Sequence, residues 1–211
     1  MLLDSRGEAK SEMCRGRLIY VVGPSGAGKD TLLQYVRERI PVAAPVVFAH
    51  RYITRRTRGE SEDHVPLTPA EFSLRLRAGF FAMHWHANGK AYGIGVEIDQ
   101  WLRNGFQVVV NGSRGYLAEA RRTYPDLLLV FVGASIDVLN TRLAYRARET
   151  PVEIAQRVER SLALAKPLHV PDLVLHNDNA PREAGEQLLN FVLQHLPANE
   201  VEPADVEFAI G

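Results

Sequence analysis

Short, mostly hydrophobic runs recur along the chain, and segments with helical spacing of their hydrophobic residues separate them. Such runs are typical of strands that are buried on both faces of a parallel sheet. The runs are 18–22, 46–48, 106–110, 127–132 and 172–176, and helices are predicted at 31–40, 69–78, 96–103, 115–123, 135–145, 151–166 and 181–196. Strands and helices that alternate at this spacing predict an α/β fold, in which a five-stranded parallel core sheet carries helices on both faces.

The remaining segments divide the chain into one domain and two tails. Residues 1–15 predict a disordered leader that lacks the hydrophobic centre of a signal peptide, and residues 197–211 predict a loose acidic tail. Within the domain, 16–196, residues 50–95 have a mixed pattern that is polar and Arg-rich at first, and residues 146–150 form a polar break. We expect one domain with insertions at these two places.

Charge and composition exclude several classes of protein. The 211 residues include 25 Lys and Arg and 25 Asp and Glu, which is unlike the strongly basic balance of a dedicated nucleic-acid binder. The one cysteine, Cys14, cannot form a disulfide within the chain, which fits a reducing cytoplasm. No hydrophobic run approaches the roughly 20 residues that span a bilayer. We expect a cytoplasmic protein without nucleic-acid or membrane partners, and the sequence leaves the oligomeric state open, with a homodimer as one possibility.

Residues 23–29, GPSGAGK, match the phosphate-binding pattern G-x-x-x-x-G-K and lie between the first predicted strand and the first predicted helix. The glycines let several backbone N–H groups point at one anion, beside the positive end of the helix dipole. Lys29 would reach the β- and γ-phosphates of the donor, and the alternative is a plain Gly-rich turn. We predict that ATP is bound by Gly23, Pro24, Ser25, Gly26, Ala27, Gly28, Lys29, Asp30 and Thr31.

One residue departs from this pattern. Asp30 stands where Ser or Thr normally supplies a hydroxyl ligand for Mg²⁺. A carboxylate is a hard oxygen ligand for Mg²⁺, although it would repel the triphosphate unless the metal lay between them. We hypothesise that Asp30 holds Mg²⁺ directly or through water. The alternative is that Asp30 only stabilises the first turn of the helix electrostatically.

Arginines cluster at the start of the mixed segment. They are Arg51, Arg55, Arg56 and Arg58. The cluster could be an ordinary solvated face, but guanidinium groups match phosphate oxygens two at a time, so we favour binding of a phosphate acceptor. The acidic residues within 60–63 interrupt the basic stripe that nucleic-acid binding would need.

Polar side chains also follow two of the predicted strands. Asn111, Ser113 and Arg114 come just after strand 106–110, at the edge where open α/β sheets bind ligands. This position favours phosphate binding by Arg114, and the alternative is a surface arginine on the next helix. Residues 176–178 follow the fifth strand and are expected near the adenosine site.

Four segments together resemble the guanylate kinase family over about residues 17–195. They are GPSGAGKDTLL (23–33), TRRTRGE (54–60), Tyr92-Gly93 and the Arg-rich break at 146–148. The resemblance implies a P-loop core, an insertion at about 50–95 that binds the phosphate acceptor, and a small lid at about 146–157 that closes over ATP.

The resemblance also implies roles for single residues. Arg55, Arg58 and Tyr92 match residues that hold the acceptor's phosphate. The catalytic residues it implies are Lys29 and the lid arginines Arg146, Arg148 and Arg157. No general base is needed, because a phosphate oxygen is already ionised at neutral pH and catalysis is positioning plus neutralisation of charge.

Two departures from guanylate kinases narrow the resemblance. Met83 aligns with the glutamate that reads guanine, and Ile94 aligns with a serine that contacts the base. Neither side chain can supply those hydrogen bonds. Compared with guanylate kinases, this sequence therefore keeps the residues that hold the acceptor's phosphate and lacks the residues that bind the base.

A narrower family, ribose 1,5-bisphosphate phosphokinase, combines all of these features. It shares G-K-D, R-Y-I-T-R (51–55), W-H-A-N-G (85–89) followed by Tyr92-Gly93, and V-N-G-S-R (110–114) with this chain. The resemblance implies that ATP phosphorylates the 1-phosphate of ribose 1,5-bisphosphate in phosphonate breakdown. The acceptor, a sugar phosphate, would be bound by Arg51, Arg55, Arg58, His86, Asn88, Tyr92, Asn111, Ser113 and Arg114.

Several alternatives stay open. His86 and Asn88 fit a structural turn nearly as well as a substrate contact, and His84 with His86 lacks the further ligands of a zinc site. A guanylate or other nucleoside monophosphate kinase is opposed by Met83 and Ile94. A non-catalytic binding module of the same fold is opposed by the complete P-loop.

Overall fold

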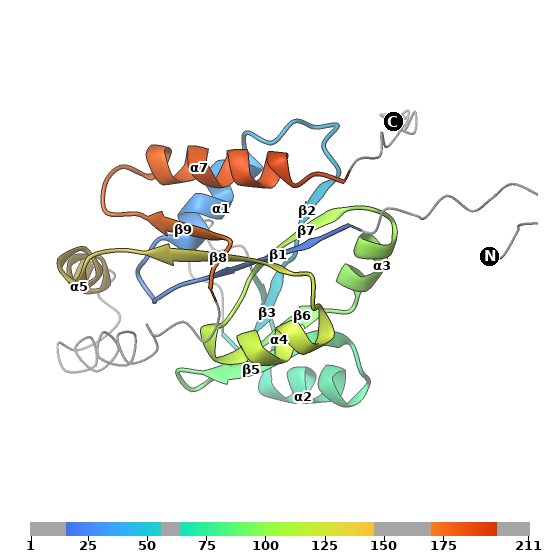
Figure 1. Ribbon diagram of the computed structural model, residues 1–211. Coiled ribbons are helices and arrows are strands. Elements are labelled where there is room, and N and C mark those ends of the chain that lie inside the picture. The colour runs from blue at the N-terminus through green and yellow to red at the C-terminus, as the bar shows by residue number, and fades with distance from the viewer. Residues whose placement is uncertain (1–15, 56–63, 146–169, 198–211) are drawn as a thin grey trace, which may run out of the picture.

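Five parallel strands form the core sheet, as the hydrophobic runs predict. The computed structural model describes residues 16–55, 64–145 and 170–197, and Figure 1 shows how their elements are arranged. The strands are β1 (Leu18–Val22), β2 (Val46–Phe48), β7 (Gln107–Asn111), β8 (Leu128–Gly133) and β9 (Leu173–His176). Their order is β2-β7-β1-β8-β9, and every neighbouring pair is parallel. The carboxyl end of β1, where the phosphate-binding pattern begins, is therefore flanked by β7 and β8.

Helices cover both faces of this sheet (Figure 1), which confirms the predicted fold class. They are α1 (Lys29–Arg37) and α7 (Pro181–Gln194) on one face and α3 (Glu97–Arg103) and α4 (Leu117–Thr123) on the other, and α5 (Ile136–Tyr145) follows β8. Successive residues of β1 point to opposite faces. Ile19 and Val21 belong to the core beneath α1 and α7, and Tyr20 and Val22 belong to the core on the other face.

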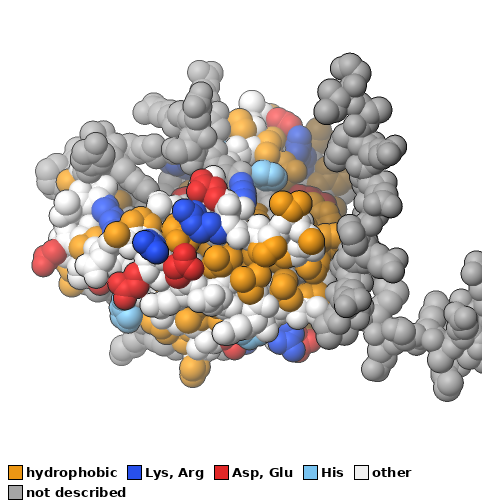
Figure 2. Space-filling model, turned by 90° about the horizontal axis from the view of Figure 1, so that it is seen from above, with side chains coloured by type: hydrophobic (Ala, Val, Ile, Leu, Met, Phe, Trp, Pro, Cys, Tyr) orange, Lys and Arg blue, Asp and Glu red, His pale blue; other side chains and the backbone are white. Residues whose placement is uncertain are grey.

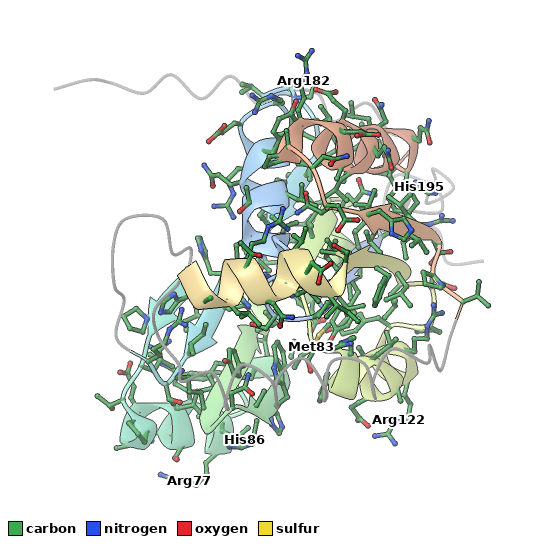
Figure 3. All side chains as sticks on the ribbon, turned by 90° about the vertical axis from the view of Figure 1, so that its left-hand side faces the viewer. Arg77, Met83, His86, Arg122, Arg182 and His195 are labelled. Atoms are coloured by element: carbon green, nitrogen blue, oxygen red, sulfur yellow. The ribbon has the colours of Figure 1, made fainter. Side chains whose placement is uncertain are left out.

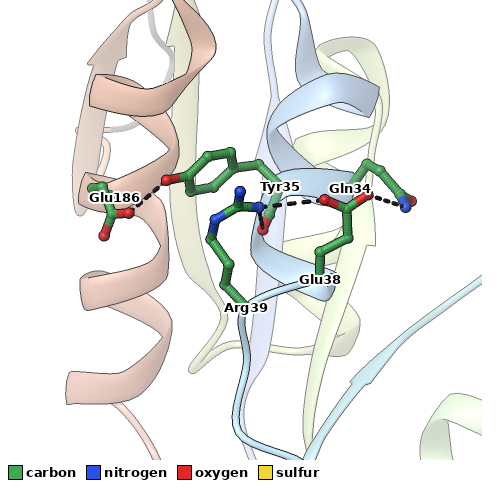
Figure 4. Close-up of polar contacts among 5 residues, drawn as sticks. All are labelled: Gln34, Tyr35, Glu38, Arg39 and Glu186. Carbon is green, nitrogen blue, oxygen red and sulfur yellow. Dashed lines mark hydrogen bonds and ion pairs between the residues drawn. The ribbon is translucent and has the colours of Figure 1, made fainter.

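α1 and α7 are held together by a tyrosine that crosses between them. Gly185 lies so close to the Tyr35 ring that a Cβ at position 185 would come 2.5 Å from Tyr35 Cδ1. The Tyr35 hydroxyl donates a hydrogen bond of 2.5 Å to Glu186 Oε1, and the Arg39 guanidinium lies 3.7 Å from the centre of the Tyr35 ring (Figure 4). This contact lies on the face of the core sheet opposite α3 and α4 (Figure 1).

A second, mixed sheet is built from the segment between β2 and α3. It contains β3 (Arg51–Ile53), β4 (His64–Pro66), β5 (Phe81–Ala87) and β6 (Lys90–Gly95), and α2 (Pro69–Arg77) packs beside it. The order is β4-β3-β6-β5, in which only the β3–β4 pair is parallel. Its own small core contains Leu67, Phe72 and Ala91. We call this part, residues 51–95, the insertion sheet.

The elements differ from the sequence predictions mainly in the insertion sheet. The predicted helix 69–78 and the strand-like pieces around 80–85 are confirmed as α2 and β5. The hydrophobic pattern did not reveal β3, β4 or β6 as strands. The predicted helix 115–123 begins with a 3₁₀ turn, η1 (Arg114–Tyr116). The predictions for 1–15, 146–166 and 198–211 lie outside the described residues.

The surface on the α7 side is divided by side-chain type. Figure 2 shows hydrophobic side chains gathered over one part of this face and charged side chains over another. Within the described ranges, no helix is both long and apolar enough to cross a membrane. The expectations of a homodimer and of no nucleic-acid partner stay predictions.

Candidate functional site

The P-loop requires glycine at the residue where α1 begins. Gly28, the N-cap of α1, has φ 86°, in the left-handed region that side chains with a Cβ rarely adopt. A Cβ at position 28 would also lie 2.3 Å from Asn177 Nδ2. Conformation and space therefore both select glycine, as the phosphate-binding pattern predicts.

Asn177, directly after β9, holds the P-loop in place from the side of the core. Its side chain is buried, and Nδ2 donates a hydrogen bond of 2.7 Å to the carbonyl oxygen of Ala27. Its own N–H donates to Gly133 O at 2.9 Å, and its carbonyl accepts from Arg142 Nη1 at 2.8 Å. The sequence placed this residue near the adenosine site, and the structure shows that it buttresses the P-loop. A polar residue directly after a buried strand was the signal for it.

Lys29 lies across the opening of the loop. Its Nζ donates to the carbonyl oxygens of Gly23, at 2.9 Å, and Pro24, at 3.0 Å. These two hydrogen bonds hold the ammonium group against the first residues of the loop. The predicted role of Lys29 in binding phosphate oxygens stays a prediction.

Asp30 joins three elements that are far apart in the sequence. Its Oδ1 accepts a hydrogen bond of 2.7 Å from Asn111 Nδ2, at the end of β7, and an ion pair of 2.6 Å from Arg51 Nη2, at the start of β3. The three residues line a cavity of about 40 Å³ beside α1. We call Asp30, Arg51 and Asn111 the Asp30 cluster. The sequence predicted each of them as a site residue but did not predict that they meet.

The Asp30 cluster contains one polar atom without a partner. Asn111 is only 5% exposed, and its Oδ1 has no hydrogen-bond partner among the described residues. Asp30 remains accessible, with 55% of its side chain exposed. One carboxylate and one amide oxygen are the kind of donors that Mg²⁺ uses when phosphates and water complete its shell. The exposed Asp30 carboxylate offers Mg²⁺ one oxygen ligand, whereas Asn111 Oδ1 is buried, and no group of three or more His, Cys, Asp or Glu side chains in the described part of the chain could hold a metal ion.

The predicted acceptor-binding residues of the insertion sheet fall into two groups. Arg51 and Arg55 lie at the start of β3 and just after its end, and Tyr92 pairs with Ile53 across β3 and β6. The Tyr92 ring stacks on Trp85, with centroids 5.5 Å apart and planes 1° apart. This group adjoins the Asp30 cluster, because Arg51 belongs to both.

His86 and Asn88 form the second group, at the turn between β5 and β6. Asn88 and Gly89 have φ angles of 49° and 67°, the left-handed pair expected for an Asn-Gly hairpin turn. Both side chains are exposed, and Figure 3 shows His86 near the outer end of the insertion sheet. The turn explains Asn88 on structural grounds, and a role in substrate binding stays a prediction for both residues.

Met83 and Ile94, which replace the expected base-reading residues, are inside the molecule. Each has 0% of its surface exposed, and both belong to the core between the insertion sheet and the main sheet. Figure 3 shows Met83 in the interior. Both side chains are therefore packed inside the molecule, and their alignment with base-reading residues stays a prediction.

A buried tyrosine fixes the segment after β7. The Tyr20 hydroxyl accepts a hydrogen bond of 2.9 Å from Ser113 N and donates one of 3.1 Å to Ser113 O. Burial raises the pKa of Tyr20, so the phenol stays protonated. Partial burial lowers the pKa of Arg114 below its ordinary value. Ser113 thus has a fixed backbone at the carboxyl edge of the sheet, beside Asn111.

Four predicted site residues lie outside the described residues: Arg58, Arg146, Arg148 and Arg157. Their roles, like the binding roles of the other predicted residues, stay predictions. What the structure brings together is the P-loop with Lys29, the Asp30 cluster and the first strand of the insertion sheet.

Comparisons with known proteins place this geometry in a family. No family model matches the chain. Several proteins named ribose 1,5-bisphosphate phosphokinase PhnN are similar to it, and two of them match over most of their length. The protein from Thiobacillus denitrificans is 49% identical over 180 residues, which cover 85% of this chain and 94% of that protein. The protein from Pseudomonas paraeruginosa is 51% identical over 177 residues, which cover 84% and 95%.

Solved structures share the fold at much lower sequence identity. Guanylate kinase from Anaplasma phagocytophilum has a TM-score of 0.63 and 15% identity, and the match covers 87% of each chain. A sugar kinase from Janibacter sp. has a TM-score of 0.50 and 21% identity, covering 87% of this chain and 97% of that one. These likenesses concern the fold alone.

Proposed function

The chain belongs to the ribose 1,5-bisphosphate phosphokinase family, and from this premise we propose its reaction. The enzyme transfers the γ-phosphoryl group of ATP to the 1-phosphate of ribose 1,5-bisphosphate, giving 5-phosphoribosyl 1-diphosphate and ADP. The observation that carries the proposal is the 49% identity over 94% of a relative with this named activity. The reaction would supply phosphoribosyl diphosphate in the cytoplasm during phosphonate breakdown.

The geometry supports a donor site built from the P-loop. Backbone N–H groups at the start of α1 and the Lys29 ammonium would bind the phosphates of ATP. Asn177 keeps the loop in shape through its hydrogen bond to Ala27 O. The loop therefore orients the γ-phosphoryl group without having to fold around it, which lowers the entropic cost of reaching the transition state.

The acceptor side supports a phosphorylated sugar rather than a nucleotide. Arginine side chains stand at the start of β3 and after its end, whereas the positions of the base reader, Met83 and Ile94, are fully buried and apolar. Arg51, Arg55 and Tyr92, with Arg58 and Arg114, would bind the acceptor's phosphates. The attacking phosphate oxygen is already ionised, so the chain has only to position it and neutralise charge.

A divalent cation completes the proposed site. Asp30 would hold Mg²⁺, and the cation would neutralise charge on the phosphate oxygens of the donor when bound. The lid arginines Arg146, Arg148 and Arg157 would add positive charge to the transferring group.

The first test is ADP release from ATP and Mg²⁺ with ribose 1,5-bisphosphate or GMP offered separately. We expect turnover with the sugar bisphosphate, phosphoribosyl diphosphate as product and little turnover with GMP. The matched variants are Arg55→Met, which should raise KM for the acceptor, and Arg77→Met, which removes the same charge from an exposed position on α2 (Figure 3) and should not.

Each other outcome points to a different function. Preference for GMP would mean a guanylate kinase and would contradict the reading of Met83 and Ile94. ATP binding without turnover of either acceptor would favour a binding module or another acceptor.

A further inference from the structure

Asp30 makes two contacts that the usual residue at this place in a P-loop could not make. Its Oδ1 accepts a hydrogen bond of 2.6 Å from Arg51 Nη2 and one of 2.7 Å from Asn111 Nδ2. A Ser or Thr hydroxyl lies closer to the backbone than a carboxylate oxygen and carries no charge, so it could not balance a guanidinium. The departure from the P-loop pattern therefore comes with a charged partner on the insertion sheet.

Asn111 is the fixed end of this chain of contacts. It is 5% exposed and is the last residue of β7, whose five residues are all buried. The Asp30 side chain is 55% exposed, and without a partner an exposed carboxylate would populate several rotamers. The hydrogen bond from Asn111 Nδ2 therefore holds the carboxylate in one orientation from the side of the core.

Arg51 connects these contacts to the proposed acceptor site. It is the first residue of β3, and only 18% of its side chain is exposed. A guanidinium has five N–H donors, so one that gives a donor to a carboxylate keeps others for phosphate oxygens. An arginine loses much rotamer freedom when it binds a ligand, and an ion pair that already orders the side chain reduces this cost.

We infer that Asp30 is a positioning residue for the acceptor, since it orients the Arg51 guanidinium and is itself held by Asn111. This explains why an acidic residue follows Lys29, and it assigns Asn111 to the support of Arg51 rather than to direct contact with the acceptor. The role adds to the metal role proposed above, because both contacts described use Oδ1. The inference rests on the proposed function only in that Arg51 binds a phosphate of the acceptor.

Asp30→Thr separates this role from metal binding. Threonine restores the hydroxyl with which P-loops normally bind Mg²⁺, but it cannot pair with Arg51. We expect KM for the acceptor to rise about threefold to tenfold, the range for loss of one partly exposed ion pair that orders a binding group. The kcat and the Mg²⁺ concentration at half of the ADP-dependent rise in Tm should change less than about twofold.

Two further variants show whether Asp30 acts through Arg51. Asp30→Asn keeps an oxygen that accepts both hydrogen bonds and loses only the charge, so its KM for the acceptor should lie between those of the parent and Asp30→Thr. Arg51→Met should raise this KM by itself. Adding Asp30→Thr to Arg51→Met should then have no further effect, as a double-mutant cycle requires if the two residues act through one contact.

Arg37→Met is the matched control for Arg51→Met. Arg37 lines the same cavity from α1 but lies over the Phe48 ring, 5.0 Å from its centre. Its removal takes the same charge from the same region, so it measures the general effect of charge on acceptor binding. We expect KM for the acceptor to stay within about twofold of the parent, because solvent and salt screen such a charge.

Four results would overturn the inference. An unchanged acceptor KM in Asp30→Thr, with a lower Tm, would mean that the Arg51–Asp30 pair is only a structural tie. A higher Mg²⁺ midpoint without a change in KM would mean that Asp30 serves the metal alone. A further rise in KM when Asp30→Thr is added to Arg51→Met would mean that Asp30 does not act through Arg51. An equal rise in Arg37→Met would mean a general charge effect.

Failure of the proposed function would look different. A parent protein that turns over GMP in place of the sugar bisphosphate would contradict that function, and the same ratios of KM would then be measured with GMP, whose phosphate Arg51 would bind. If Asp30→Thr does not fold, Asp30→Ser gives the same test with a smaller side chain that also carries the hydroxyl.

Discussion

The donor side and the acceptor side of this enzyme are built in different ways. The P-loop is made of backbone groups, and buried contacts hold it: Asn177 against Ala27 O, and the glycine that no larger residue can replace at position 28. The proposed acceptor side consists of long side chains on short strands of a second sheet with its own small core. A backbone site fixes which group is bound, whereas a side-chain site can be altered residue by residue.

The largest expected effect comes from restoring a base reader in the insertion sheet. Met83→Glu places a carboxylate where 0% of the side chain is exposed, and an uncompensated buried charge costs about 3–5 kcal/mol. We expect a large fall in the free energy of unfolding, measured by urea titration, and no gain of guanylate kinase activity. Met83→Leu is the control and should cost less than about 1.5 kcal/mol. A stable Met83→Glu enzyme that phosphorylates GMP would show that the acceptor side can be converted by one residue.

Lys29→Met tests whether the donor side depends on one side chain as well as on the backbone. We expect kcat to fall about 10²- to 10³-fold, since one preorganised positive donor to the phosphates is lost. The Tm without nucleotide should change little. Lys90→Met, in the hairpin of the insertion sheet, is the matched control and should retain kcat. Equal losses in the two variants would contradict the proposed role of Lys29.

Asn177→Ala sharpens the comparison by loosening the P-loop without touching its sequence. The buried carbonyl of Ala27 loses its partner, which should lower the free energy of unfolding by about 2 kcal/mol. Nucleotide affinity, measured by calorimetry, should fall together with stability. His176→Ala changes the exposed neighbour and should leave both within about 0.5 kcal/mol. Unchanged ATP affinity in Asn177→Ala would mean that the loop keeps its shape by itself.

The smallest effect is expected at the tie between α1 and α7, away from both ligands. The hydrogen bond to Glu186 raises the pKa of Tyr35 above its ordinary value of 10.0. A raised folded-state pKa stabilises the protein below the unfolded-state value, and this stability is lost as the pH rises through the folded-state value. Tyr35→Phe should therefore lower Tm slightly at neutral pH and flatten its decline above pH 10, with kcat and KM unchanged. A change in KM would connect this tie to the active site.

The core could be predicted from the sequence because its strands are buried on both faces. Mostly hydrophobic runs located β1, β7 and β8 to within a residue or two, and G-x-x-x-x-G-K located the loop. The insertion sheet was harder. β3 and β4 have three residues each, and β6, KAYGIG, contains two glycines, so pairing between strands rather than local pattern defines them.

The site was predicted as residues but not as contacts. Asp30, Arg51 and Asn111 were each expected to bind a ligand, yet their common oxygen depends on strand order, which places β7 between β1 and β2. The burial of Met83 likewise depends on tertiary packing that no local sequence pattern reveals. The resemblance to guanylate kinases predicted that a base reader is absent, and the packing between the two sheets shows that Met83 is buried.

The stacked pair of Trp85 and Tyr92 has an optical consequence. The chain has two tryptophans, and the second, Trp101, packs at the edge of the core from α3. Trp85 lies parallel to Tyr92 and also 5.9 Å from the Tyr116 ring of η1, so it spans the insertion sheet and the main domain. A Trp101→Phe protein would emit from Trp85 alone. Its fluorescence would then report on the junction between the two sheets, and any rearrangement of Tyr92 on acceptor binding could be followed in real time without a label.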